Sequence, residues 1–523
     1  MNDAPTTAFR FTAVDALLTA LLTLVGAAVR LYALQLVPTL TDETDEIQFA
    51  LRIAGGGFAP AVSVDAYNGP LHHYLMAAGL ALGGGAPWPR TLVMLLGALT
   101  VGLTYLLGVS LAAQAGGRGS AWPRLAGGIA AALMAVSFVP VVVNSHIAWS
   151  NATTPFWTTL TLVILSEARR QARPALLVAA GVAAGLAVQT HPTAIIVLVG
   201  AAAWVAVTRP AWLRTRWPWL ALGAAILMVS NLIGYNVLTA GGSAEGAARR
   251  DYAFTGGVGL SEYLANAQGF VGLAYQMVGS TFVSTLGGDA GAAAMRSPAV
   301  ILYAVVAVTA VLYTARRAGL PLACWLAALA LLPIINRAYD SHISARYMAP
   351  LLPPTFAAMG ALLAAGVAML RGGSWARLAV GAAAATLAML LVVYPAARLN
   401  NYYFFELADG RNNARLWQLV DAVRGPGQAG TPILLDRGLR DARLDAGGHV
   451  YKALGTLLDL ERVPHQNPRV EELPTAPDGA LLVLTDAQRE ALASILRLTP
   501  VDVGAPPLPA APGGYWLYRV DSH

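Results

Sequence analysis

The sequence has little charge, one cysteine and a single lysine. Only 12% of its 523 residues are charged, against about 25% in an ordinary soluble domain, and the mean hydropathy is +0.57. This scarcity excludes a disordered chain and disfavours a purely soluble enzyme. The one cysteine, Cys324, excludes an intrachain disulfide. Lys452 is the only lysine and arginine supplies the other basic residues, which is typical of a GC-rich coding sequence and indicates a prokaryotic source.

The positive charge does not point to a nucleic-acid partner. The net charge is +6 at pH 7, with an isoelectric point near 9.4. The arginines, however, lie mainly in short gaps between long apolar runs. A 56% share of hydrophobic residues in such runs indicates an integral membrane protein instead.

About eleven apolar runs are predicted to be membrane-spanning helices, each of which needs about 20 residues to cross a bilayer. The first lacks a small-residue cleavage site and is interpreted as a signal anchor. The eleven predicted spans are residues 12–35, 90–112, 124–145, 153–167, 175–190, 192–208, 217–238, 299–315, 319–336, 347–370 and 378–395.

Arginine placement predicts a cytoplasmic N-terminus, because arginine concentrates in every second gap between spans. The gaps near residues 144–152 and 191 contain none, so they are predicted to face outward. The gap at 337–346 is an exception with Arg337 and Arg346. An odd number of spans then places the C-terminus outside the cytoplasm.

Three segments are predicted not to span. Residues 36–89 form a first outer loop with interfacial helices, residues 239–298 a second outer loop, and residues 396–523 a small α/β domain outside the membrane. In this tail we expect helices at 412–423 and 488–496, and strands at 431–435, 480–484 and 515–520. The predicted domains are thus a transmembrane part, 1–395, and a soluble part, 396–523.

The acidic residues are almost absent from the interiors of the predicted spans and cluster just after the first one. The absence disfavours an ion-coupled transporter, which keeps ionisable groups near the membrane midplane. The cluster, called here the acidic segment, consists of Asp42, Glu43, Asp45 and Glu46. Like charges held together raise a pKa or bind a cation, so the segment is a candidate general base or metal site. The structural alternative is that acids favour the first turn of a helix, here capped by Thr41.

The first outer loop continues through Tyr67 and Asn68 to a turn at Asn-Gly-Pro, then to His72 and His73. Two adjacent histidines cannot point the same way on a helix, so a shared metal site is disfavoured. The alternative for this stretch is an interfacial helix with aromatic and histidine anchors.

Six motifs in order resemble the GT-C membrane glycosyltransferases, in the branch of the protein mannosyltransferases and the aminoarabinose transferase of lipid A. The resemblance covers about residues 10–400. The motifs are Asp42-Glu43 with its repeat Asp45-Glu46, Gly69-Pro70-Leu71-His72-His73-Tyr74-Leu75, Pro89-Arg90, Asn144-Ser145-His146-Ile147-Ala148-Trp149-Ser150-Asn151, Gln189-Thr190-His191-Pro192, and Arg346-Tyr347-Met348-Ala349-Pro350.

The resemblance implies an all-α, GT-C-like membrane bundle that transfers a hexosyl or pentosyl group, with inversion, from a polyprenyl-phosphate donor to an acceptor hydroxyl on the outer face. The acceptor class, protein, lipid or glycan, stays open. The base would be Asp42 or Asp45. The spacing from Asp42 to Ala50 and Ile53 fits the helix that follows the Asp-Glu pair in the family, which favours Asp42. The Asp-Glu-x-x-aromatic-Ala pattern favours Asp45.

The leaving phosphate requires positive charge, for which the candidates are Arg346, His342 and Arg337, with Arg249 and Arg250 as weaker ones. A divalent cation, Mg²⁺ or Mn²⁺, is an alternative to which the sequence does not commit. The candidates for lining the sugar pocket are Tyr67, Asn68, His72, His73, His146, Trp149, Asn151 and His191. For Arg346, Trp149 and Asn151 the structural alternatives are contact with lipid headgroups, interface anchoring and helix capping.

Two other functions stay open at this stage. One is a non-enzymatic carrier or flippase for a lipid-linked sugar. The other is an assembly or sensor protein whose outer domain binds a partner, in which case neutralising the acidic segment leaves function intact.

Overall fold

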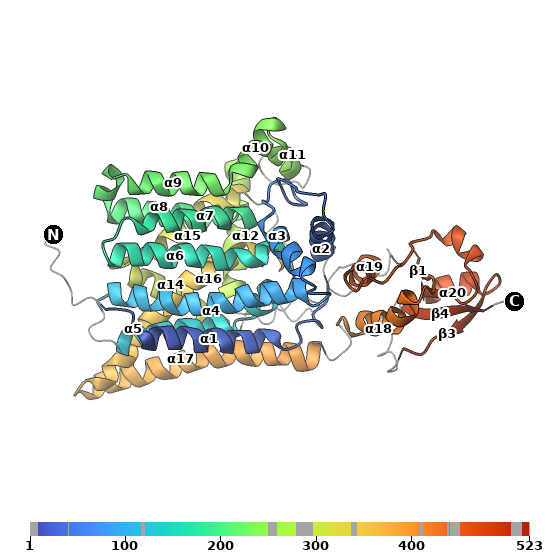
Figure 1. The fold of residues 1–523 in the computed structure, drawn as a ribbon. Coiled ribbons are helices and arrows are strands. Elements are labelled where there is room, and N and C mark those ends of the chain that lie inside the picture. The colour runs from blue at the N-terminus through green and yellow to red at the C-terminus, as the bar shows by residue number, and fades with distance from the viewer. Residues whose placement is uncertain are drawn as a thin grey trace. The chain divides into compact units, whose positions relative to one another are not determined.

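The computed structural model describes residues 9–39, 41–116, 121–248, 259–278, 297–335, 342–407, 412–436, 439, 450–503 and 515–521 (Figure 1). The chain forms two compact units. The first, the bundle unit, contains the chain up to Tyr32, Ala59–His72 and Leu92–Asn400. The second, the tail unit, contains Ala33–Phe58, His73–Thr91 and the chain from Asn401 onward. Two parts of the first loop therefore group with the tail, whereas the predicted division lies at a single boundary after residue 395.

The bundle unit is built of helices with apolar outer faces. They are α1 (Ala13–Leu31), α4 (Trp88–Gln114, whose first turn belongs to the tail unit), α5 (Ala121–Val136), α6 (Thr154–Arg170), α7 (Leu176–Thr190), α8 (Ala194–Thr208), α9 (Trp217–Met228), α10 (Ser230–Leu238), α11 (Gly242–Ala248), α12 (Leu260–Val278), α14 (Pro298–Ala315), α15 (Leu320–Ile335), α16 (Leu352–Val367) and α17 (Trp375–Asn401).

A helical membrane bundle is confirmed, and the number of spans is confirmed only in part. Each of the eleven predicted spans falls on a helix. Among the described residues five helices are long and apolar enough to cross a bilayer, or six if the bent pair α9–α10 is one span. The five are α1, α4, α14, Arg346–Arg371 and Trp375–Phe405. The other predicted spans fall on the shorter helices α5, α6, α7, α8 and α15, of 15 to 17 residues.

Close approach between helices depends on small residues. Helix α7 packs against both α6 and α9, and α16 packs against α5 (Figure 1). A Cβ atom added to Gly181 of α7 would overlap the backbone of Ala221 in α9, and one added to Gly360 of α16 would overlap the Ala126 carbonyl in α5. Membrane helices commonly bring their backbones together at such glycines.

The bend of 60° between α9 and α10 is stabilised by side chains from elsewhere in the bundle unit. The break leaves helix carbonyls without their usual partners, which is tolerated only when other groups satisfy them. Gln189 donates to the Met228 carbonyl at 2.6 Å and contacts the Asn231 side chain, while Asn231 donates to the Ala61 carbonyl at 2.6 Å. The Gln-Thr-His-Pro motif therefore begins with a residue that holds this bend.

The segment after α5 also leaves the regular α-helix. Val139–Val143 form a π-helix, and Ser150–Thr153 a 3₁₀ turn. Polar side chains satisfy the carbonyls that this irregular path frees: Ser145 donates to Pro140 at 2.7 Å and Trp149 to Val143 at 3.1 Å. The buried Arg30 of α1 donates to Met134 at 3.0 Å. Irregular backbone of this kind is frequent at functional sites.

The tail unit combines two first-loop helices with a mixed sheet. Its elements are α2 (Thr41–Ala54), α3 (Leu71–Ala81, which begins in the bundle unit), α18 (Ala414–Gln428), β1 (Ile433–Leu435), α19 (Val450–Leu460), β2 (Leu481–Thr485), α20 (Asp486–Leu492), β3 (Arg497–Pro500) and β4 (Tyr515–Asp521). The strand order is β1-β2-β4-β3, with β1 parallel to β2 and the other pairs antiparallel. Apolar cores cover both faces of the sheet.

The sheet is close to what the tail sequence predicts. The three predicted strands overlap β1, β2 and β4, and the two predicted helices overlap α18 and α20, although α20 ends at Leu492 rather than at residue 496. Helix α20 begins at a capping box, in which Thr485 accepts from the Gln488 backbone. Two elements are not predicted: the short edge strand β3 and helix α19.

Candidate functional site

The acidic segment lies in the first turns of α2, and its four carboxylates point in different directions around the helix. Successive residues of an α-helix are rotated by about 100°, so four acids within five positions cannot share one face. Glu43 is 1% exposed and lies on the buried side with Ile47 and Ala50, whereas Asp42, Asp45 and Glu46 are partly exposed. Each carboxylate therefore has its own surroundings within the tail unit.

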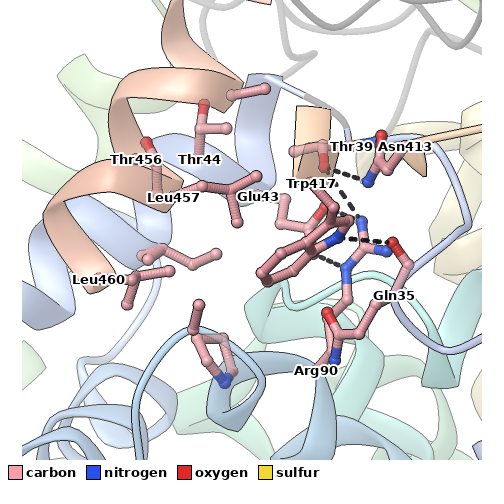
Figure 2. A pocket seen from close by; sticks show the side chains of 14 residues that line it. Gln35, Thr39, Glu43, Thr44, Arg90, Asn413, Trp417, Thr456, Leu457 and Leu460 are labelled. Carbon is pink, nitrogen blue, oxygen red and sulfur yellow. Dashed lines mark hydrogen bonds and ion pairs between the residues drawn. The ribbon is translucent and has the colours of Figure 1, made fainter. Parts of the chain in front are cut away.

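Glu43 forms a buried ion pair with Arg90, in the first turn of α4. Both guanidinium nitrogens that face Glu43 donate to its carboxylate at 2.8 Å, which is the bidentate geometry (Figure 2). The remaining donors of Arg90 reach the Leu34 and Val37 carbonyls at 3.0 and 2.7 Å. The pair is shielded from water, so removal of either partner would leave a buried charge without its counter-charge.

The network continues into the start of α18. Arg90 donates to Thr39 at 3.2 Å, and Asn413 donates to the same hydroxyl at 2.8 Å and to the Val37 carbonyl at 2.8 Å (Figure 2). Trp417 lies over the pair and donates to the Gln35 carbonyl at 3.2 Å (Figure 2). The cavity between these residues and α19 has about 20 Å³, enough for one water molecule and far too small for a sugar.

Asp45 pairs with the chain's single lysine. Lys452 Nζ, in α19, lies 2.8 and 3.1 Å from the two carboxylate oxygens of Asp45. One turn further along α2, Gln48 donates to Asp459 of α19 at 2.6 Å. The two side chains of the ion pair are 38% and 43% exposed, so water reaches them.

Glu46 and Asp42 lie on the remaining face of α2. A carboxylate oxygen of Glu46 is 3.5 Å from His73 Nε2, and the His73 ring also meets the edge of Phe49. Asp42 is half-buried in the first turn, one residue before Glu43. The structure therefore gives Glu43, Asp45 and Glu46 three different partners, namely Arg90, Lys452 and His73.

Four predicted site residues meet a fifth residue, Tyr347, in the bundle unit, and the group is called here the arginine–aromatic cluster. It consists of Tyr67, Trp149, His191, Arg346 and Tyr347, from four separate segments. The Arg346 guanidinium lies 4.2 Å from the Trp149 ring centre and donates to the Tyr347 hydroxyl at 3.1 Å. His191 stacks on Tyr347 at 5.2 Å, and the edge of Tyr67 approaches His191 at 6.3 Å. One cation is thereby held among aromatic faces.

The charge state of His191 follows from this arrangement. Burial, and secondly the positive charge of Arg346, lower the pKa of His191 to about 3, so the ring is neutral near pH 7. The Thr193 backbone N–H donates to His191 Nδ1 at 3.2 Å, which makes Nδ1 an acceptor. A neutral ring with an accepting Nδ1 has its proton on Nε2, so His191 is a hydrogen-bond donor at that atom.

Several other candidates are tied into the scaffold. His146 contacts the Val141 carbonyl at 2.8 Å and the Tyr32 carbonyl at 3.0 Å. Burial lowers the pKa of His72 to about 4, against the opposing effect of a hydrogen bond to the Ala148 backbone. Asn68 and Asn151 are buried, in the loop before α3 and in the 3₁₀ turn after Trp149. His146 and Asn151 belong to the irregular segment that carries Trp149, and His72 is hydrogen-bonded to it at Ala148.

The structure describes little about the remaining candidate residues. Arg337, Arg249 and Arg250 lie outside the described residues. His342 begins the short 3₁₀ helix His342–Leu351, whose later residues include Arg346. Within the described ranges no three His, Cys, Asp or Glu side chains are grouped so that they could hold a metal ion.

Sequence reasoning missed four residues of these networks as site residues: Arg90, Tyr347, Asn413 and Lys452. Arg90 and Tyr347 do stand in motifs of the resemblance, next to Pro89 and Arg346. A lone lysine in a chain that otherwise uses arginine is a signal for Lys452. Nothing in the sequence indicates Asn413, because its partners lie more than 370 positions away.

The comparisons agree with the resemblance drawn from the sequence. Residues 67–235 match a protein family described as dolichyl-phosphate-mannose-protein mannosyltransferase. Comparison with curated proteins finds no match.

Solved structures with the same architecture cover nearly the whole chain. ArnT from Cupriavidus metallidurans bound to undecaprenyl phosphate matches with a TM-score of 0.53 and 16% identity, over 97% of each chain. The apo state of the same protein matches with a TM-score of 0.54 and 15% identity, over 97% of this chain and 98% of that one. At this identity the likeness shows a shared fold.

Proposed function

We propose that this chain, which has the fold of the GT-C membrane glycosyltransferases, transfers a sugar from a polyprenyl-phosphate donor to an acceptor hydroxyl. The proposal rests above all on the arginine–aromatic cluster, where a cation and a neutral histidine donor lie together. The family match covers Tyr67, Trp149 and His191 of this cluster, whereas Arg346 lies beyond it. The structurally similar ArnT binds undecaprenyl phosphate, which supports a donor of that class.

The general base in this proposal is Asp42. Its carboxylate takes the proton of the acceptor hydroxyl, the hydroxyl oxygen attacks the anomeric carbon, and the bond from that carbon to the phosphate oxygen breaks. Polyprenyl phosphate leaves with the bonding electrons, and the anomeric centre is inverted. Asp42 is preferred over Asp45 because the spacing from Asp42 to Ala50 and Ile53 fits the resemblance better, and this register places the buried Glu43 directly after the base.

The leaving phosphate in this proposal is held by Arg346 and His191. The Arg346 guanidinium lies 4.2 Å from the Trp149 ring centre, and a guanidinium group carries a planar set of N–H donors that suits phosphate oxygens. His191 Nε2–H adds a neutral donor. Tyr67 contributes a ring edge and a hydroxyl that donates to Asp65 at 3.1 Å, and we propose that it borders the sugar.

We further propose that the first loop and the tail lie outside the cytoplasm. The support is the alternation of arginine-rich and arginine-free gaps, which the helices of the bundle unit preserve: the connections after α5 and α7 contain none, whereas those after α6 and α8 do. An outward-facing site suits a lipid-linked donor, because no nucleotide sugar is needed there.

The experiment incubates the purified protein in lipid nanodiscs with polyprenyl-phosphate-linked mannose, glucose, arabinose and aminoarabinose, plus a membrane extract as acceptor source. Mass spectrometry follows donor loss and polyprenyl phosphate release. We expect one donor to be consumed by wild type, and by Asp421→Asn as a matched carboxylate control, since Asp421 is exposed and pairs with Arg424 of the same helix.

A carrier gives a different result. In proteoliposomes a flippase moves intact donor between leaflets without releasing polyprenyl phosphate. Translocation of uncleaved donor, with no release of polyprenyl phosphate from any of the four donors, contradicts the transferase proposal.

A further inference from the structure

Helix α2, which carries the acidic segment, is in contact with the C-terminal part of the chain within the tail unit. Helices α2 and α19 pack against each other within the tail unit. Thr44 of α2 lines the same small cavity as Thr456 and Leu457 of α19 (Figure 2). Ile47 of α2 lines it as well. Apolar packing holds α2 against α19, but it does not by itself fix the rotation of α2 about its own axis.

Two polar contacts fix that rotation. Lys452 holds Asp45 at 2.8 Å, and Asp459, seven residues further along α19, accepts from Gln48 at 2.6 Å. Asp45 and Gln48 are three residues apart and share one face of α2, as do Lys452 and Asp459, two turns apart, on α19. The Asp45–Lys452 and Gln48–Asp459 contacts therefore follow one another in the same order along α2 and α19.

We propose that Lys452 is a positioning residue for the acid-bearing helix, acting through Asp45, and that the C-terminal part of the chain thereby sets the orientation of the base. This inference rests on the proposed function, in which Asp42 is the base. Asp42 lies one turn before Asp45, with Glu43 anchored to Arg90 between them. The buried pair holds one side of the first turn, and the Lys452 contact holds the other.

Charge makes Lys452 suited to this role. Four carboxylates in one short helix repel one another and are compensated by a few cations. Arg90 neutralises Glu43 on the buried side. On the exposed side Lys452 pairs with Asp45, and no other lysine exists in the chain that could replace it.

The test reverses and then swaps the charges of the full-length protein in nanodiscs. Lys452→Glu places a carboxylate against Asp45, and Asp45→Lys with Lys452→Glu restores the pair with its polarity exchanged. Amide hydrogen exchange of residues 41–54 reports the stability of α2, and initial rates give kcat and the donor KM. Lys452→Arg is the conservative variant, and the swap of Arg489 and Glu490, an exposed pair in α20, is the matched control.

We expect Lys452→Glu to speed exchange in α2 by about two- to fivefold, the range for an exposed ion pair. We also expect kcat to fall with little change in donor KM. The swap and Lys452→Arg should return both quantities to within twofold of wild type, and the control swap should change neither.

Two results overturn the inference. In one, Lys452→Glu leaves both α2 exchange and kcat unchanged, so α19 only packs against α2. In the other, the swap restores α2 protection while kcat stays at the level of Asp45→Asn, so Asp45 itself acts in the chemistry. A wild type that consumes no donor contradicts the proposed function instead, and the exchange data still decide whether Lys452 holds α2.

Discussion

The acidic segment and the arginine–aromatic cluster are opposite cases of how sequence distance relates to contact. The four acids lie within five positions, yet three of them are tied to Arg90, Lys452 and His73 on different sides of α2. The five residues of the cluster span 281 positions, from Tyr67 to Tyr347, yet their rings and the guanidinium meet. A dense run of charge is thus weak evidence for a shared site.

Helix geometry explains both cases. A rotation of about 100° per residue spreads neighbouring side chains around α2. The cluster instead draws on the ends of helices: Trp149 lies between α5 and α6, His191 between α7 and α8, and Arg346 between α15 and α16. In a bundle of consecutive antiparallel helices, every second connection lies at the same end, so these residues converge.

The largest expected effect concerns the acidic segment, where loss of the buried Glu43–Arg90 ion pair should lower the free energy of unfolding. Glu43→Gln leaves Arg90 buried without its counter-charge, and Arg90→Met does the same to Glu43. Each should lower the free energy of unfolding by about 3–5 kcal/mol, as expected for a broken buried ion pair. Thermal unfolding in nanodiscs measures this. Arg489→Gln at an exposed pair serves as the control and should change it by less than about 0.5 kcal/mol. A loss below about 1 kcal/mol for both buried variants would falsify the structural role of this pair.

The next largest effect concerns the arginine–aromatic cluster and is measured as kcat/KM for the donor. Arg346→Gln removes the charge that we propose for the leaving phosphate, and kcat/KM for the donor should fall by about 10- to 100-fold, the worth of a charged hydrogen bond. Arg346→Lys should recover only part of the loss, because an ammonium neither stacks on Trp149 nor donates bidentately. Full activity of Arg346→Lys argues for a simple charge effect, and full activity of Arg346→Gln rules out the phosphate role.

A smaller effect concerns acid stability. The pKa of His191 is lowered from 6.5 to about 3 and that of His72 from 6.5 to about 4. Below pH 6.5 the unfolded chain takes up protons that the folded chain does not, so stability falls as the pH drops from 6.5 toward these values. Apparent unfolding temperatures between pH 7 and 4 should fall less steeply in His191→Gln than in wild type. Parallel curves would show that His191 is already protonated in the folded state.

The smallest effect tests the aromatic platform alone. Trp149→Phe keeps an aromatic face under Arg346 but weakens the cation–π contact, for which about 0.5–1 kcal/mol is at stake. The donor KM should rise about two- to fivefold with kcat little changed. A change in kcat without a change in KM would place Trp149 near the reacting atoms rather than beneath the phosphate ligand.

Much of the fold follows from the sequence, because apolar runs and strand-forming stretches are local signals. The eleven predicted spans fall on helices of the bundle unit, and the predicted strands overlap β1, β2 and β4, whereas α11 and α12 lie in the predicted second outer loop. Helix α19 and strand β3 were missed, since α19 follows a stretch without a clear helix start and β3 is a four-residue edge strand. The number of membrane-spanning helices is harder to predict, because α5, α7, α8 and α15 are apolar but only 15 or 16 residues long.

The sequence predicts most residues of the candidate site but not the contacts between them. The sequence names Arg346, Trp149 and His191 from motifs at predicted outer connections between spans, and Tyr67 from the first outer loop. Their pairing was not predictable, because the stacking of Arg346 on Trp149 depends on the irregular path after α5. The partners of the acidic segment, Lys452 and Arg90, were also not predictable, since each lies far along the chain from the acid it binds.

The most direct measurement compares Asp42→Asn with Asp45→Asn in the rate of polyprenyl phosphate release, at saturating donor and with Asp421→Asn as the control. A general base contributes about 10²- to 10⁴-fold, so Asp42→Asn should lose at least about 100-fold in kcat. Asp45→Asn should lose less than about tenfold, because its carboxylate acts only through Lys452. The opposite order, with Asp45→Asn inactive and Asp42→Asn active, would contradict the assignment of the base and with it the positioning role of Lys452.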